Sequence, residues 1–285
     1  MPSSMSAHSI FERLGLADSP VLFDVREAVD FTARPRLIPG ALRGDPDQVG
    51  DWGRSLPRTR AVVAYCKHGG KTSCFVADAL NTMGYPGFIL EGGIEGWIDA
   101  GYPTVKARAD LNAPGASRWV TRERPKIDRL ACPWLVRRFI DPRASFFYTP
   151  AHQVRAESQA LHAEPYDIAD VTFSHRGTRC SFDAFLDEFD LHDPVIDQVA
   201  DIVRAADTGE LGQSREAPGL LAISLGLSAN VRDDIVLLEQ AMPVYDALYA
   251  WCKTARNETH SWPQKVAIQW APPRRSPSAR RSESG

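Results

Sequence analysis

The first hundred residues alternate short apolar runs with stretches of helical periodicity. Apolar runs typical of buried strands cover residues 21–25, 61–65 and 87–90. Between the last two, apolar residues recur over 75–83 at the spacing of one helix face, and Gly84 follows as a plausible helix-ending glycine. A strand, a helix and a strand joined by short links form a βαβ unit. The pattern therefore predicts an α/β domain in which helices flank a parallel sheet.

The pattern then changes to one dominated by helices. A helix with one apolar face is expected to end at Pro142, and a short strand is expected over 146–148. Further helices are predicted over 195–207 and 232–252, and Pro243 is expected to break or kink the second of them. This part of the chain therefore reads as a mainly α-helical (α+β) unit.

These changes of pattern divide the chain into two domains. The first is predicted to span residues 10–105, and a linker with little apolar periodicity covers 106–120. The second domain is predicted over 121–269. The last segment, 270–285, is rich in Ser, Pro and Arg and is expected to be a disordered tail.

Composition narrows the class of protein. The 285 residues carry a formal net charge of −3, which gives no global argument for binding nucleic acid or a membrane. No apolar run approaches membrane-spanning length, and the first twenty residues have no apolar signal-peptide core. The five cysteines are scattered and contain no C-x-x-C pair, so they fit a reducing compartment. We therefore expect a cytoplasmic protein.

Cys66 stands at the most informative position of the chain. It follows the apolar run 61–65 and precedes Gly69 and Gly70, after which a helix is expected. Such a loop can aim several backbone N–H groups at one point in front of a helix N-terminus, which favours a thiolate. The residues alone leave an inert buried thiol as the alternative.

Four motifs in order around this cysteine resemble the rhodanese family of single-domain sulfurtransferases. The resemblance covers about residues 10–104. The motifs are Asp24–Glu27 after an apolar strand, Ile38–Ala41, Tyr65–Thr72, and Gly84–Tyr85 followed by Leu90–Gly93 and Trp97.

The resemblance implies that Cys66 takes a sulfane sulfur from a donor such as thiosulfate and passes it, as a persulfide, to a thiophilic acceptor. It also implies a substrate-binding loop of Lys67, His68, Gly69, Gly70, Lys71 and Thr72. Lys71 stands where the family often has Arg, and it lacks the planar fork of a guanidinium. Asp24 and Arg26 either support the site through hydrogen bonds or form an ion pair at the strand end.

The second block resembles the C-terminal domain of ChrB-type chromate resistance proteins. The matching segments are 124–142, 175–182, 202–208, 219–227 and 245–252. Full-length members are linked to chromate-responsive regulation but carry a different N-terminal domain, so DNA binding is not carried over. The resemblance implies a sulfurtransferase linked to chromate or oxyanion stress. The alternative is a regulatory or binding protein that senses a metal or an oxyanion.

Cys132 is the second thiol of interest. If a helix begins at Pro133, Cys132 lies at its positive end, near Asp128, Arg129 and Arg137, and a thiolate is favoured. If Asp128 caps the helix instead, Pro133 lies inside it and causes a kink. Both alternatives stay open, as does a relay of sulfur from Cys66 to Cys132.

His175, Cys180, Asp183 and Asp207 are of the residue types that bind divalent transition metals. They show no standard zinc spacing, and ordinary structural roles are the simpler interpretation. A divalent metal in the C-terminal domain is therefore an open alternative rather than a predicted cofactor. The expected partners are a small sulfur donor and acceptor, with no membrane or nucleic acid. A protein partner or a homo-oligomer stays open.

Overall fold

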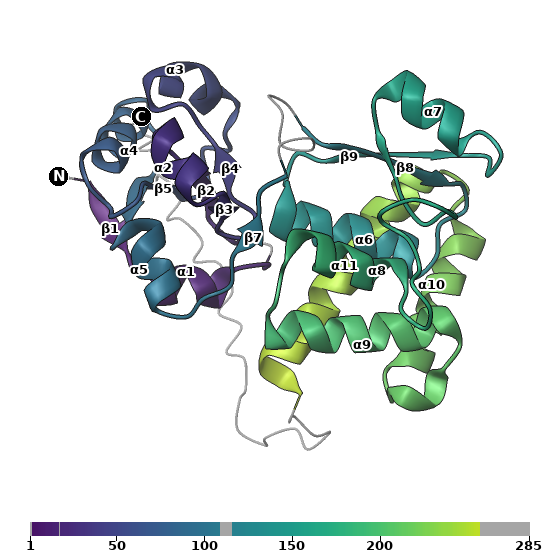
Figure 1. Cartoon of the computed structure of the whole chain (residues 1–285). Helices are drawn as coiled ribbons and strands as arrows, with labels where there is room; N and C mark the ends of the chain where they lie inside the picture. Colours follow the sequence, from purple (N-terminus) through teal and green to yellow (C-terminus); the bar gives the residue numbers. More distant parts are fainter. Residues whose placement is uncertain (1, 17, 109–115, 257–285) are drawn as a thin grey trace, which may run out of the picture.

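The computed structural model describes residues 2–16, 18–108 and 116–256 (Figure 1). We call residues 2–108 the N-terminal region and residues 116–256 the C-terminal region. The two lie side by side in Figure 1. The tail predicted over 270–285 lies outside the described residues. Among the helices that are described, none is both long and apolar enough to cross a membrane.

The N-terminal region is built on a five-stranded parallel sheet with the strand order β1-β6-β5-β2-β4. The strands are β1 (Ser3–Met5), β2 (Val21–Asp24), β4 (Leu42–Arg43), β5 (Val62–Tyr65) and β6 (Gly87–Leu90). The helices are α1 (Ala7–Arg13), α2 (Ala28–Ala33), α3 (Val49–Trp52), α4 (Lys71–Thr82) and α5 (Gly93–Asp99). The predicted parallel sheet flanked by helices is confirmed.

Burial explains why the central strands read as continuous apolar runs. All four residues of β5 are buried, because helices cover both faces of a parallel sheet. Helix α4 buries Ser73, Val76, Ala77 and Leu80, which recur at the spacing of one helix face. Gly84 has φ 82° just beyond the end of α4, as expected for a helix-ending glycine.

The C-terminal region combines helices with a small parallel sheet of order β10-β8-β9, which confirms the α+β expectation. Its strands are β8 (Arg118–Arg122), β9 (Ser145–Thr149) and β10 (Glu164–Pro165). Its α-helices are α6 (Asp128–Leu135), α7 (Val154–Leu161), α8 (Ser181–Phe189), α9 (Pro194–Thr208), α10 (Ala217–Asn230) and α11 (Asp234–Ala250).

Both ends of the predicted linker 106–120 belong to strands. Lys106 lies in β7 (Val105–Lys106), which pairs antiparallel with β3 (Arg36–Leu37). At the other end, β8 begins at Arg118. Residues 109–115 lie outside the described part of the chain.

Two prolines lie inside helices, at Pro133 in α6 and Pro243 in α11. Helix α6 begins at Asp128, so the alternative in which a helix starts at Pro133 is wrong. Of the break or kink expected at Pro243, the break does not occur, because α11 continues to Ala250. A turn of π-helix, Val136–Ile140, follows α6.

Tertiary contacts explain how α6 tolerates its proline. Pro133 has no N–H for the Arg129 carbonyl, which would normally accept a bond from that position. The hydroxyls of Tyr148 and Tyr166 donate to this carbonyl instead, at 3.4 and 3.3 Å. Side chains from other elements therefore replace the missing main-chain donor.

One hydrophobic core runs through both regions. It includes Ile10 and Trp97 from the N-terminal region together with Trp134 and Phe139 from the C-terminal region. At the boundary, the Gly40 N–H donates to the Phe139 carbonyl at 2.7 Å. The two regions are thus packed against each other as one body of buried side chains.

Candidate functional site

Cys66 lies directly after β5, at the carboxyl edge of the parallel sheet, where ligands of open α/β sheets commonly bind. Its side chain is partly buried. The Gly70 N–H donates to its Sγ at 3.1 Å, and Ser73 Oγ lies 3.4 Å from the same sulfur. Helix α4 starts at Lys71, so the sulfur lies beside a helix N-terminus.

The surroundings of Cys66 lower the pKa of its thiol from the ordinary value of 9.0. Burial acts in the opposite direction and is the largest single influence. It is outweighed by hydrogen bonds from the Ser73 hydroxyl and from the backbone N–H groups of Gly70, Ser73 and His68. The expectation of a loop that favours the thiolate is therefore matched by its geometry.

The Gly92–Gly93 pair that follows β6 holds this loop in place. Gly93 has φ 58°, and a Cβ there would collide with the Cys66 carbonyl and lie 2.6 Å from both the Gly69 N and the Lys67 carbonyl oxygen. The N–H groups of Ile94 and Glu95, in the first turn of α5, donate to the carbonyls of Cys66 and Lys67 at 3.0 and 3.1 Å. Only glycine fits at position 93, since the two backbones touch.

Two lysines bring positive charge to the loop. Lys67 Nζ lies 3.3 Å from Asp30 Oδ1 and is therefore paired. Lys71 is exposed in the first turn of α4, which contains no acidic residue. A helix N-terminus disfavours a cation. The placement of Lys71 at this helix N-terminus raises the local positive potential that an anionic ligand would meet.

Asp24 and Arg26 form a buried ion pair, with Nη2 and Oδ2 2.6 Å apart. Arg26 also donates to the carbonyls of Arg34 and Arg36, at 3.0 and 2.7 Å. Arg26 is 2 % exposed, so its guanidinium is occupied by these protein groups. Of the two roles considered, the geometry is that of the strand-end ion pair.

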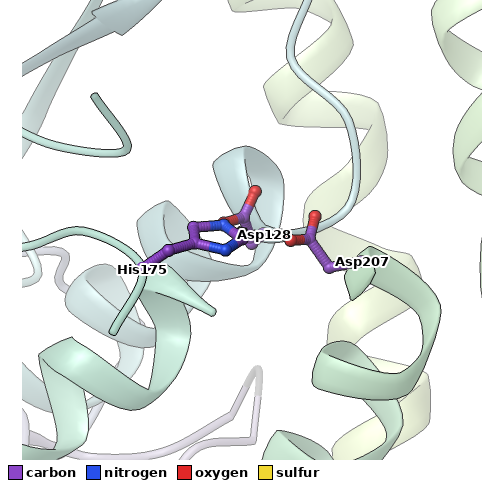
Figure 2. A group of neighbouring side chains, drawn as sticks. All are labelled: Asp128, His175 and Asp207. Carbon is purple, nitrogen blue, oxygen red and sulfur yellow. Dashed lines mark hydrogen bonds and ion pairs between the residues drawn. The ribbon is translucent and has the colours of Figure 1, made fainter. Parts of the chain in front are cut away.

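A second cluster lies in the C-terminal region, where Asp128, His175 and Asp207 meet from three separate elements (Figure 2). Asp128 is the first residue of α6, His175 lies on the loop before α8, and Asp207 is the penultimate residue of α9. His175 Nε2 lies 3.2 Å from Asp128 Oδ2 and 3.2 Å from Asp207 Oδ2. Asp167 Oδ1 approaches the same nitrogen at 3.4 Å.

Unusual backbone angles place two of these carboxylates. Ile127, which precedes Asp128, has φ 32°, a region that β-branched residues rarely adopt. It is held by the Tyr245 hydroxyl, which donates to its carbonyl at 2.7 Å, and by Ser224 Oγ, which accepts from its N–H at 2.9 Å. Asp167 has φ 53°. Such strain persists only where surrounding contacts enforce it.

The charges of the cluster are partly compensated. Asp167 pairs with Arg122 at 2.6 Å and Arg129 at 3.1 Å. Burial would raise the pKa of Asp167, but the hydrogen bonds from His175 and Arg122 outweigh it and lower this pKa.

The pKa values of Asp207 and His175, by contrast, are raised. Burial and the adjacent Asp128 raise the pKa of Asp207 to about 7. Hydrogen bonds to Asp128 and Asp167 raise the pKa of His175 to about 10.

The thiols of this region are enclosed rather than accessible. Cys132 and Cys180 are both fully buried. Burial raises the pKa of both thiols, and the charge of Asp128 adds to the effect. A thiolate at Cys132, one of the two alternatives left open by the sequence, is therefore disfavoured, and a direct sulfur relay from Cys66 would have no exposed acceptor there.

The remaining predicted residues occupy structural positions. Asp183 accepts from the Cys180 N–H at 3.0 Å and from Arg204 at 2.6 Å, so it caps α8 and lies outside the cluster. Arg137 pairs with Glu239 at 2.6 Å. Of the four residues considered as possible metal ligands, the structure brings together His175 and Asp207. Asp128 completes this set, and Asp167, beside them, was missed because nothing in its local sequence distinguishes it.

Two family models match separate parts of the chain. The rhodanese-like domain matches residues 9–100, and "ChrB, C-terminal domain" matches residues 119–252. Both resemblances are thereby confirmed. Protein ChrB of Cupriavidus metallidurans is 34% identical over 152 residues, which cover 53% of this chain and 45% of that protein. The chain thus spans less than half the length of this relative.

Solved structures similar to this chain include a rhodanese-related protein from Thermoplasma volcanium, 24% identical, with a TM-score of 0.32. The match covers 36% of this chain and 97% of that one. A thiosulfate sulfurtransferase from Pseudomonas aeruginosa is 22% identical with a TM-score of 0.32, over 38% of this chain and 20% of that one.

Proposed function

We propose that this chain, in which a rhodanese-like domain precedes a ChrB C-terminal domain, is a sulfurtransferase that carries sulfane sulfur as a persulfide on Cys66. The observation that carries the proposal is the setting of this thiol. Its sulfur is partly buried and within reach of main-chain donors, and its pKa is lowered. The nucleophilic form of cysteine is the thiolate, and these contacts favour it.

The proposed reaction has two displacements. The Cys66 thiolate attacks the outer sulfur of thiosulfate, the S–S bond of thiosulfate breaks, and sulfite leaves with the electron pair. In the second step, a nucleophile such as cyanide attacks the terminal sulfur of the persulfide. The persulfide S–S bond breaks, thiocyanate leaves, and the Cys66 thiolate is restored. One difficult transfer is thereby divided into two easier steps.

The loop supplies the electrostatic part of this mechanism. The N–H groups of His68, Gly70 and Ser73 that surround Cys66 can stabilise the negative charge of the terminal persulfide sulfur. Lys71 attracts the anionic donor. As a compact charge it gives weaker orientation than a guanidinium fork would, so the preferred donor need not be thiosulfate itself.

The proposed link to chromate or oxyanion stress rests on the ChrB match of residues 119–252. A second candidate function is that of a regulatory protein that senses a metal or an oxyanion. The cluster of Asp128, His175 and Asp207 favours it. The two candidates differ in what must happen at Cys66: only the sulfurtransferase needs a persulfide there.

The decisive experiment follows thiocyanate formation by the full chain supplied with thiosulfate and cyanide, and with glutathione persulfide as a second donor. We expect wild type to turn over and Cys66→Ser to be inactive. Cys74→Ser, which removes a partly buried thiol in α4, is the matched control and should retain activity. Intact mass after donor treatment should show one added sulfur atom in wild type and none in Cys66→Ser.

If neither donor leaves a sulfur adduct on the folded wild-type protein, or if the adduct survives in Cys66→Ser, the proposed sulfurtransferase function is wrong. If the adduct forms but no thiocyanate is produced, the persulfide on Cys66 is retained in the proposal. Its acceptor is then a thiol or a protein for which cyanide does not substitute.

A further inference from the structure

We propose that Asp128, His175 and Asp207 form a binding site for a divalent transition-metal cation. This site lies in the C-terminal region and is independent of sulfur transfer at Cys66. It differs from the set considered as an alternative from the sequence, since Asp128 takes the place of Cys180 and Asp183.

Distances carry the first argument. The Asp128 and Asp207 carboxylate oxygens each lie 3.2 Å from His175 Nε2, and the three ligand atoms lie within 4.8 Å of one another. In a tetrahedral site with metal–ligand distances near 2.0–2.1 Å, neighbouring ligand atoms lie about 3.3–3.4 Å apart. The oxygens therefore stand around the nitrogen at the separations that ligands of one cation have.

Hydrogen bonding alone does not explain this convergence. The Nε2 atom carries at most one proton, and it can direct that proton well at one acceptor. Three carboxylate oxygens nevertheless approach it. A cation placed between the Asp128, His175 and Asp207 atoms would bind all three, and it would also separate the carboxylates of Asp128 and Asp207.

The donors are held in place before any ion arrives. Tyr245 and Ser224 fix the main chain just before Asp128. Asp167 presents Oδ1 to the cluster while Arg122 holds its Oδ2, and the Ser181 hydroxyl donates to Oδ1 at 2.9 Å. Contacts of this kind around metal ligands orient them and raise affinity.

The donor set also selects the kind of cation. One imidazole with two carboxylates suits Zn²⁺, Mn²⁺ or Fe²⁺, whereas Ca²⁺ and Mg²⁺ prefer oxygen ligands alone. The His175 side chain is 41% exposed, so a path from solvent reaches the site. An ion there would keep one side open to water or to a small ligand.

The test uses the full chain, stripped with a chelator and dialysed, with Zn²⁺ as the first probe and Mn²⁺ as the second. Calorimetric titration and elemental analysis are made in wild type and in Cys66→Ser, so that metal held by the Cys66 thiol is recognised. We expect one ion per chain in both proteins, and an increase in Tm when the ion binds.

Two variants remove ligands, and two matched variants do not. His175→Ala and Asp207→Asn should each weaken Zn²⁺ binding by at least about tenfold, the lower end of what is lost even when outer contacts of a metal site are removed. His152→Ala and Asp201→Asn, an exposed histidine and an exposed carboxylate on α9, should leave the affinity unchanged. Unchanged circular dichroism of the metal-free variants confirms that they fold.

The proposal is overturned if wild type binds neither Zn²⁺ nor Mn²⁺, or if folded His175→Ala binds Zn²⁺ as wild type does. It is also overturned if bound Co²⁺ shows intense thiolate-to-metal absorption in Cys66→Ser, because cysteines rather than carboxylates would then be the ligands. None of these outcomes depends on whether Cys66 transfers sulfur.

Discussion

Cys66 and Cys132 show how differently one residue type behaves in the two regions. Cys66 is partly buried at a strand end, where backbone N–H groups and the Ser73 hydroxyl surround its sulfur and its pKa is lowered. Cys132 is fully buried in α6 beside carboxylates, and its pKa is raised well above the ordinary value. The reactive state of a thiol is thus decided by the donors and charges around it.

The same contrast extends to the two clusters. The Cys66 loop brings together backbone N–H groups and the exposed Lys71, which suits a negative ligand. The Asp128 cluster brings together carboxylates whose negative charge is only partly compensated by neighbouring cations, which suits a positive ligand. The two regions therefore favour ligands of opposite charge, although they share one hydrophobic core.

The largest effect is expected from Gly93→Ala. A Cβ at position 93 would collide with the Cys66 carbonyl, and the residue has φ 58°. The loop must move, and a displacement of about 1 Å can lower turnover by about 100-fold. Thiocyanate formation measures the loss. Gly101→Ala has φ 77° but open space, so it should keep its activity and lose only stability. Equal activity loss in both variants would contradict the argument that a collision with the Cys66 carbonyl causes the loss.

Tyr245→Phe tests whether the strained turn positions Asp128. It removes the hydroxyl that donates to the Ile127 carbonyl at 2.7 Å. We expect Zn²⁺ affinity to fall by about tenfold, as when outer contacts of a metal site are lost. Tyr249→Phe removes a buried hydroxyl one turn further along α11 and should not change the affinity. If Tyr245→Phe lowers Tm but leaves the calorimetric affinity intact, the hydroxyl is structural only.

Ser73→Ala tests the donors around Cys66. Because the pKa of Cys66 is lowered, its alkylation by iodoacetamide should reach half-maximal rate below pH 9.0, the ordinary thiol value. Removing the Ser73 hydroxyl removes a contact that favours the thiolate, so the midpoint should move to higher pH. The rate at pH 7 should then fall by about tenfold or more, as expected for the loss of one hydrogen bond to a charged group. Ser55→Ala, at an exposed serine, should leave the pH dependence of Cys66 alkylation unchanged.

The smallest effect is expected from Lys71→Gln. Removing a cation from the first turn of α4 should stabilise the protein slightly, by about 0.3–1 kcal/mol at most. It should also raise the KM for thiosulfate by about two- to fivefold with little change in kcat, since an exposed charge attracts the donor without reacting. A KM that is insensitive to both Lys71→Gln and added salt would show that Lys71 does not attract the donor.

The Cys66 loop could be predicted from sequence because its determinants are local. The strand, the thiol, the glycines and the following helix lie within a dozen consecutive residues, and Gly92 and Gly93 belong to a motif of the rhodanese family. The contact of this glycine pair with the loop is seen only in the structure. The strands 21–25, 61–65 and 87–90 were predicted because burial on both faces leaves a continuous apolar run. Strand β1 was missed because three residues, two of them serine, carry no such signal.

The Asp128 cluster could not be predicted in the same way, because its members are separated by up to 79 positions in the sequence and meet only in three dimensions. His175 and Asp207 were singled out by residue type alone. Asp183 was grouped with them, although it caps α8. The prolines show the same limit: the propensity of Pro133 to interrupt a helix is overcome by hydroxyls of Tyr148 and Tyr166, which no local pattern reveals.

The core shared by Ile10, Trp97, Trp134 and Phe139 joins the two regions, so we expect them to unfold together. A ligand that binds only the native state stabilises every part of a protein that unfolds together with its binding site. Slow amide protons of β5 should therefore exchange more slowly when a cation occupies the Asp128 cluster, although no ligand touches that strand. The persistence of the folded Cys66 loop would then be set partly by the occupancy of a site in the other half of the chain.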